Sequence, residues 1–163
     1  MPWGTEAVLW GLAYSLWLSA LILLSYRHQP RIWLHDYPPE MRACVPPKTD
    51  SEVRLTRLWA LPVTGSMLLI PAFIALWRDA VYGFTYFEAY AFVVTIMLTF
   101  CVFDLLVLDW LITVWWRPAW MQLKGAEAMR RHDNVRYHLV RSVQGLPFPL
   151  VGGAVAALPF VLR

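Results

Sequence analysis

Charged residues are scarce in this chain: Asp, Glu, Lys and Arg make up 15% of its 163 residues, whereas 59% of the residues are hydrophobic. Because soluble domains carry about a quarter of their residues as charged side chains, this balance excludes an ordinary soluble domain and predicts a membrane protein. The net charge is only +3, and the basic residues are grouped in two connecting segments. We therefore expect the lipid bilayer and anionic lipid headgroups as partners, and no nucleic acid.

Cysteines are few, and the spacings of familiar metal and redox motifs are absent. Cys44 and Cys101 lie far apart in the sequence and are expected at different membrane depths, which argues against a disulfide. No HExxH, HxxxH or CxxC pattern occurs. The first eight residues include Glu6 but no Lys or Arg. Since a cleaved signal peptide begins with a basic region, we interpret the first apolar segment as a retained anchor.

Long apolar runs are what the chain does contain, and the longest covers residues 89–116. These 28 residues include no Lys, Arg, Gly or Pro. At about 1.5 Å of rise per residue, a helix of this length measures roughly 42 Å, which exceeds the roughly 30 Å of bilayer hydrocarbon. The run therefore predicts a tilted or projecting transmembrane helix. Its two charges, Asp104 and Asp109, need explaining, because an ionised carboxylate at the bilayer centre costs at least ~2.5 kcal/mol.

Four apolar segments predict an all-α integral membrane protein, a four-transmembrane-helix bundle that forms a single membrane domain over residues 1–163. Thr49 and Glu52 have capping-box spacing, which places a helix start near Asp50. The last segment is rich in Pro and Gly, and this predicts a kinked or interrupted helix. The expected helices are approximately 7–26, 50–77, 89–116 and 145–162, and the connectors are 27–49, 78–88 and 117–144.

The third connector is expected to contain a short amphipathic helix that lies at the membrane surface. Asp133 or Asn134 would cap this helix, and its apolar face would consist of Val135, Leu139 and Val143. The chain would then turn back into the bilayer at about residue 145.

Basic residues are distributed unevenly along the chain. Six of the 14 Lys and Arg residues lie in residues 27–57 and six in residues 117–144, which leaves only Arg78 and Arg163 elsewhere. Since Lys and Arg favour the cytoplasmic side, both long connectors are predicted to be cytoplasmic and both termini to lie outside. We accordingly expect a multi-pass protein of the bacterial inner (cytoplasmic) membrane.

This orientation gathers polar residues on the cytoplasmic side, because all four histidines fall in the two long connectors. The central helix would carry Asp104 and Asp109 in its cytoplasmic half. Residues five apart are separated by about 140° around an α-helix, so these aspartates should face different neighbours unless the helix is distorted. The candidate catalytic residues are Asp104, Asp109, His35, Asp36 and His138, and the candidate anion or headgroup ligands are Arg117, Arg141, Arg130 and Arg131.

Three functions are open for this face of the protein. In the leading interpretation the acids are structural, and the chain is a small inner-membrane protein of structural, accessory or interaction type that acts with a partner membrane protein or as a homo-oligomer. In the alternative, an aspartate and a histidine form a membrane-embedded enzyme or metal site, for which imidazole and carboxylate together suit Zn, Mn or Fe. In the third, the acids belong to a proton or ion path through an oligomer.

The segments FDLLVLDW at 103–110 and LHDYPPEMRACVPPKT at 34–49 resemble a group of small, uncharacterised polytopic bacterial membrane proteins. In that group an FDLLxLDWL-type helix is followed by a basic loop and a YxFH-like segment. Tyr137–His138 is the matching remnant here, with Leu139 where the group tends to have a second aromatic or polar residue. The resemblance implies that the HDYP segment and the two aspartates act together, and it implies no activity.

Overall fold

The computed structural model describes residues 3–125 and 135–161, and within these ranges the chain is all helical, with no strand. The predicted all-α architecture with four membrane-length helices is confirmed for this part of the chain. The stretches that are long and apolar enough to cross a membrane are Trp3–His28, Asp50–Tyr82, Tyr86–Trp116 and Val135–Phe160.

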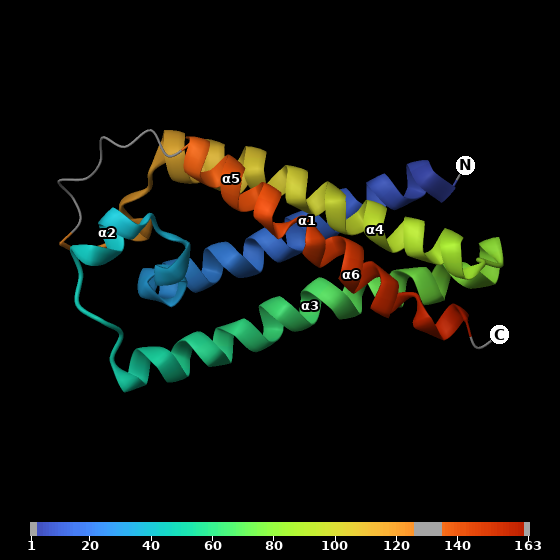
Figure 1. The fold of residues 1–163 in the computed structure, drawn as a ribbon, viewed down its shortest axis with the longest axis horizontal. Coiled ribbons are helices and arrows are strands. Elements are labelled where there is room, and N and C mark those ends of the chain that lie inside the picture. The colour runs from blue at the N-terminus through green and yellow to red at the C-terminus, as the bar shows by residue number, and fades with distance from the viewer. Residues whose placement is uncertain (1–2, 126–134, 162–163) are drawn as a thin grey trace.

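The first half of the chain forms two long helices joined by a folded connector. Helix α1 (Trp3–His28) leads into the short helices η1 (Pro30–Asp36) and α2 (Pro39–Ala43). Helix α3 (Asp50–Tyr82) then runs the length of the bundle in the opposite direction (Figure 1).

The second half begins with the central span, which is α-helical at first and continues without a break as a π-helix. The last span consists of shorter helices laid end to end (Figure 1). In chain order these elements are α4 (Tyr86–Phe103), η2 (Asp104–Trp116), η3 (Ala119–Met121), α5 (Val135–Gly145), α6 (Pro147–Ala156) and η5 (Leu158–Phe160).

Capping residues fix where two of the long helices begin. The predicted box at the start of α3 is confirmed, because the Thr49 side chain accepts a hydrogen bond from the Glu52 amide and the Glu52 carboxylate accepts one from the Thr49 amide. The same arrangement at Thr85 and Glu88 starts α4. The T-x-x-E spacing at Thr85 was available in the sequence, so this start could also have been predicted. Between the two helices, Gly83 takes a left-handed conformation (φ +58°) that ends α3.

Helix α4 lies at the centre of the bundle, in contact with α1, α3 and α6. Its side chains Phe92, Val93 and Ile96 are fully buried. The apolar run on which the sequence is centred thus also forms the centre of the packing. Because lipid tails are themselves apolar, close van der Waals packing of this kind is what holds membrane-spanning helices together.

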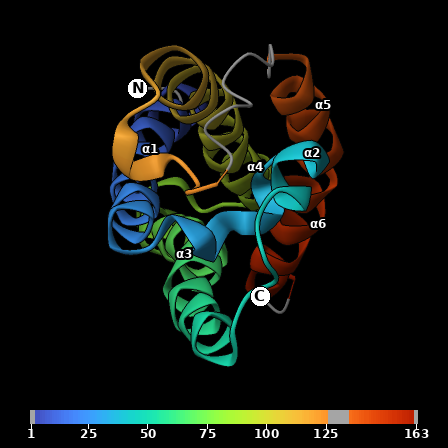
Figure 2. The ribbon, with the colours of Figure 1, turned by 90° about the vertical axis from the view of Figure 1, so that its left-hand side faces the viewer.

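The two ends of the bundle differ in what they carry. The described parts of the two long connectors lie at one end, and both chain termini point to the other (Figure 1). Seen from the connector end, η1 and α2 lie across the mouth of the bundle, between α3 and α5 (Figure 2). The described parts of both basic segments are therefore gathered at one end of the molecule.

The last span starts earlier than the sequence indicated, at Val135 instead of about residue 145. Helix α5 packs along η2 and runs on into α6, and the chain is interrupted only around Leu146. The predicted apolar face is largely the outer one, because Leu139 and Val143 are exposed while His138 is buried. The proposed caps, residues 133 and 134, lie outside the described residues.

Candidate functional site

A cavity of about 590 Å³ opens at the connector end of the bundle. Its walls come from α1, α3, the junction of α4 and η2, and the α5–α6 span. The connector that contains η1 and α2 covers the cavity at the connector end. Its volume falls within the range of roughly 300–1,000 Å³ that is typical of small-molecule sites. Of the predicted candidates, Asp36, Asp104, Asp109, His138, Arg117 and Arg141 all line this cavity.

The π-helix changes which way the two central aspartates face. In a π-helix the hydrogen bonds join residues five apart, as in the bond from the Arg117 amide to the Ile112 carbonyl at 2.8 Å. Residues five apart therefore lie near one another on the same side of the helix. Asp104 and Asp109 both line the one cavity as a result. The expectation that they face different neighbours applied to an undistorted α-helix, and the π-helix is the distortion that it left open.

Among the described residues that line the cavity, Asp109 and His138 form the closest pair of an acidic and a basic side chain. The Asp109 Oδ1 atom lies 2.8 Å from Nδ1 of His138, and this contact joins η2 to α5. His138 is only 8% exposed. A carboxylate at Nδ1 fixes the tautomer and orientation of a neutral imidazole and leaves Nε2 as a proton acceptor. The sequence named both residues but gave no sign that they pair.

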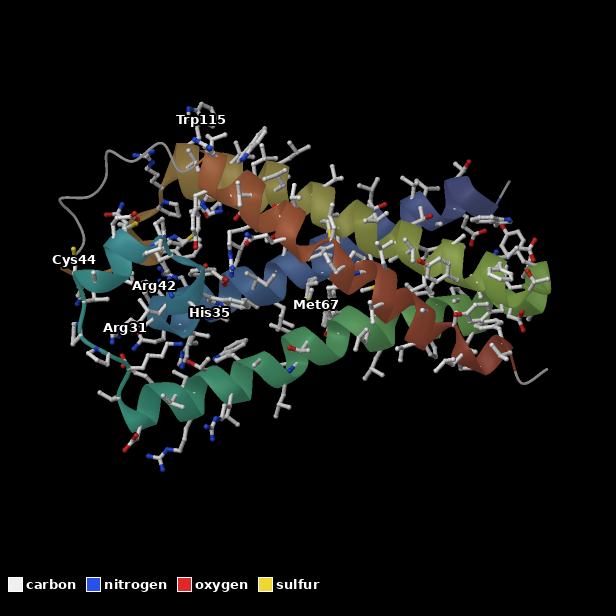
Figure 3. All side chains as sticks on the ribbon, in the orientation of Figure 1. Arg31, His35, Arg42, Cys44, Met67 and Trp115 are labelled. Carbon is white, nitrogen blue, oxygen red and sulfur yellow. The ribbon has the colours of Figure 1, made fainter. Side chains whose placement is uncertain are left out.

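Asp36 approaches the cavity from the connector and has two partners. Arg141 Nη2 lies 3.5 Å from its Oδ1 atom, and His35 Nε2 lies 3.4 Å from its Oδ2 atom. Burial raises the pKa of the Asp36 carboxyl above its usual range, although the neighbouring His35 and Arg141 oppose this shift. His35 itself is exposed and does not line the cavity, so it acts at most through Asp36 (Figure 3).

Asp104 differs from the other two acids because it has no polar partner. Among the described residues, no cationic side chain forms an ion pair with its carboxylate and no group donates a hydrogen bond to it. Its side chain is half-buried in the cavity wall. An acid in such surroundings normally has a counter-charge or a hydrogen-bond donor, so Asp104 is the group in this cavity that still needs a partner.

Two of the four predicted anion ligands, Arg117 and Arg141, line the cavity, and both are engaged by oxygen atoms of the protein. Arg141 is paired with Asp36, and the Arg117 Nε–H group donates to the carbonyl of Val114 at the end of η2. The other two, Arg130 and Arg131, lie outside the described residues.

Aromatic side chains that the sequence did not single out form one side of the cavity. Tyr26 stacks on Trp33, with ring centroids 5.7 Å apart and planes at 19°, and Tyr37 meets Tyr26 edge-on at 6.5 Å. The Trp33 indole donates to Ser25 at 2.6 Å, and this bond fixes the ring. Aromatic residues near the end of a span usually indicate the membrane interface, so their local sequence could not distinguish this role.

No metal centre is evident in the part of the chain that the structure describes, since no group of three or more His, Cys, Asp or Glu side chains there could hold a metal ion. Comparisons with protein-family models, with curated proteins and with solved structures found no match for this chain. The function must therefore be argued from the cavity itself.

Proposed function

We propose that this chain is a multi-pass membrane protein that binds an amphiphilic molecule in the cavity, with the polar head of the ligand beside the His138–Asp109 pair. The single observation that carries the proposal is this pair, 2.8 Å apart, in the wall of a cavity of about 590 Å³. Apolar side chains such as Ile22, Met67 and Phe148 supply much of the remaining wall. An apolar pocket with a few convergent polar groups is the usual form of a ligand site.

The proposal places the cavity near the cytoplasmic surface of the membrane. Two observations support this location: the four apolar spans, and the six Lys or Arg residues in each of the two segments 27–57 and 117–144. The described parts of both segments lie at the cavity end of the bundle (Figure 1). By the positive-inside rule the proposal has this end facing the cytoplasm and both termini facing outward. The bacterial inner membrane is the location that we propose with it.

The chemistry proposed for the site is acceptance and donation of a proton by His138. Asp109 holds the imidazole by Nδ1, and no described residue forms a hydrogen bond to Nε2. An imidazole oriented in this way by a carboxylate is the common arrangement for a general base. The site thus combines an apolar pocket for the hydrocarbon tail of the ligand with a proton-accepting group beside the ligand's polar head.

A proton path through a single chain has less support. The polar cluster at the other end consists of Glu6, Arg78 and Tyr82. Between that cluster and the cavity lies the apolar core around Phe92 and Ile96, both fully buried. Among its described side chains this layer has no acid and no histidine, and its buried Ser15 hydroxyl donates to the Gly11 carbonyl of its own helix.

The test is binding of a panel of decyl amphiphiles whose heads differ only in charge: decyltrimethylammonium, the neutral decyldimethylphosphine oxide, and decanoate. Met67 lines the cavity from α3 on the side that faces the other helices (Figure 3). Met67→Trp should fill the cavity. Leu69→Trp is the matched control, because Leu69 on the same helix is 70% exposed.

We expect native mass spectrometry of the protein in nanodiscs to show one bound molecule of at least one amphiphile. Met67→Trp should remove this occupancy, and Leu69→Trp should retain it. Failure of the unaltered protein to bind any of the three amphiphiles, or equal binding by Met67→Trp, would reject the proposal. A structural or accessory role, with a partner membrane protein or in a homo-oligomer, would then be the better explanation.

A further inference from the structure

We propose further that the head of this amphiphile is cationic, a protonated amine or a quaternary ammonium group, held between the Asp104 carboxylate and the aromatic side of the cavity. This inference rests on the proposed function, because it names the ligand class of the same cavity. It starts from a group that the His138–Asp109 pair does not use.

Asp104 provides the first argument, because its carboxylate lines the cavity without an ion-pair or hydrogen-bond partner among the described residues. A charge at this depth is costly unless a counter-charge joins it. A cationic head would supply the counter-charge that the Asp104 carboxylate lacks. An apolar head would leave the carboxylate without a counter-charge, and an anionic head would be repelled by it. The cavity wall at Asp104 is therefore complementary to a positive charge.

The balance of charges around the cavity points the same way. Among the described residues, the cavity wall has three carboxylates, those of Asp36, Asp104 and Asp109, and two guanidinium groups, those of Arg117 and Arg141. Arg141 is paired with Asp36, and Arg117 donates its Nε–H group to a backbone carbonyl. An anionic head would have to compete with these contacts and would lie beside carboxylates. A cationic head meets neither obstacle.

The aromatic side of the cavity supplies a second, independent attraction for a cation. Tyr26, Trp33 and Tyr37 all line the cavity, and their rings form a contiguous group through the contacts at 5.7 Å and 6.5 Å. The negative face of an aromatic ring attracts ammonium groups within about 6 Å of its centroid, and tryptophan and tyrosine do so best. Trp33 cannot easily turn away, because its indole is bonded to Ser25.

The experiment compares the dissociation constants of the same three decyl amphiphiles, measured by titration calorimetry on the full chain in nanodiscs. We expect decyltrimethylammonium to bind about tenfold or more tightly than the neutral phosphine oxide, and decanoate to bind most weakly. Asp104→Asn should reduce the preference for the cation to near unity while leaving the affinity for the neutral head within about twofold. Glu40→Gln, which removes an exposed acid on α2 outside the cavity, should change neither value.

A second variant keeps the test decisive if Asp104→Asn does not fold. Tyr26→Leu should weaken binding of the cation by about fivefold and leave the neutral head nearly unaffected, because only the cation gains from the ring face. Equal affinity for cationic and neutral heads in the unaltered protein would overturn this inference and leave the proposed function standing. Absence of binding by all three would reject both.

The cationic head could belong to a membrane lipid or to a single-chain amine, and a displacement experiment with two lipids distinguishes these sources. Displacement of bound decyltrimethylammonium by added phosphatidylethanolamine, compared with phosphatidylglycerol, identifies the ammonium head of a membrane lipid as the ligand. Displacement by neither lipid identifies a single-chain amine that enters from outside the bilayer lipids. Either result supports a cationic head, whereas displacement by phosphatidylglycerol alone would overturn it.

Discussion

Glu6 on α1 and Arg78 on α3 form an ion pair at the end of the bundle opposite the cavity, with Nε of Arg78 2.6 Å from Oε1 of Glu6. Both side chains are largely buried, being 15% and 21% exposed. The hydroxyl of Tyr82 and the indole of Trp10 also donate hydrogen bonds to the Glu6 carboxylate. One acid thus joins the first and second spans through two donors of α3, Arg78 and Tyr82, while Trp10 holds it within its own helix.

We predict that Glu6→Ala destabilises the protein by about 1–3 kcal/mol, because it leaves the Arg78 guanidinium without its counter-charge in a partly buried place. Reversible unfolding in mixed micelles measures this change. Glu6→Gln is the matched control: its one amide oxygen still accepts from either Tyr82 or Trp10, which donate to different oxygens of the carboxylate, so it should lose less stability. An equal loss in both variants would mean that charge pairing makes no difference at this end.

Close contacts at glycines make a second prediction about packing. A Cβ atom on Gly11 would lie 2.6 Å from Thr99 Cβ, and one on Gly153 would lie 2.5 Å from Val94 Cγ2. We expect Gly11→Ala and Gly153→Ala each to cost about 1–3 kcal/mol by forcing α1 or α6 away from α4. Gly65 on α3 has no atom within 4 Å of an added Cβ, so Gly65→Ala should be neutral or stabilising by up to ~1 kcal/mol. A loss at Gly65 as large as at Gly11 would contradict this explanation.

Features of the fold that depend on residues within one segment could be predicted from the sequence alone. The apolar run 89–116, with neither Gly nor Pro, predicted the central span, and the spacing of Thr49 and Glu52 predicted the start of α3. Hydrophobic length and capping act within one segment, so they can be read without knowing the neighbours.

The site could be predicted only in part, because its geometry depends on contacts between distant segments. Asp104, Asp109 and His138 were all candidates, but the shared cavity of the aspartates follows from a π-helix, and helical periodicity gave no warning of it. The burial of His138 likewise follows from packing of α5 on η2. The apolar face read from Leu139 and Val143 is exposed on the outside of the bundle, but the sequence did not indicate that the opposite side of this helix packs on η2.

The His138–Asp109 pair makes a spectroscopic prediction. Because the Asp109 carboxylate lies 2.8 Å from Nδ1, neutral His138 should carry its proton on Nδ1. In ¹⁵N spectra of histidine-labelled protein, the signal lost in His138→Gln should show this tautomer, and Asp109→Leu should shift it toward the mixture that the exposed His28 shows. A tautomer protonated on Nε2 in the unaltered protein would contradict the pairing and would remove the proton acceptor from the proposed site.

Asp36 predicts how stability depends on pH. Its pKa is raised above the usual value of 3.8 chiefly by burial, so the folded state holds the proton more tightly than the unfolded chain does. The stability contributed by the protonated carboxyl is fully present below about pH 3.8 and is lost as the pH rises through the folded pKa. Asp36→Asn cannot ionise, so its melting temperature relative to the unaltered protein should rise between pH 4 and pH 7.

The control for Asp36 is Glu40→Gln, because Glu40 is an exposed acid on the neighbouring helix α2. Its melting temperature should follow that of the unaltered protein over the same range. A difference between Asp36→Asn and the unaltered protein that stays constant with pH would mean that Asp36 ionises at the same pH in the folded and unfolded states.

The charge distribution makes a topology prediction for the protein in the membrane. With 12 of its 14 Lys and Arg residues in segments 27–57 and 117–144, the cavity end should face the cytoplasm. Alkaline phosphatase, which is active only outside the inner membrane, should be active when fused after Arg163 and inactive when fused after Lys124. Green fluorescent protein should give the reverse pattern. Cytoplasmic signals at both sites would mean that the chain crosses the membrane an even number of times, or not at all, between Lys124 and Arg163. Exchange of the two signals would turn the cavity to the outside and place its ligand in the outer leaflet.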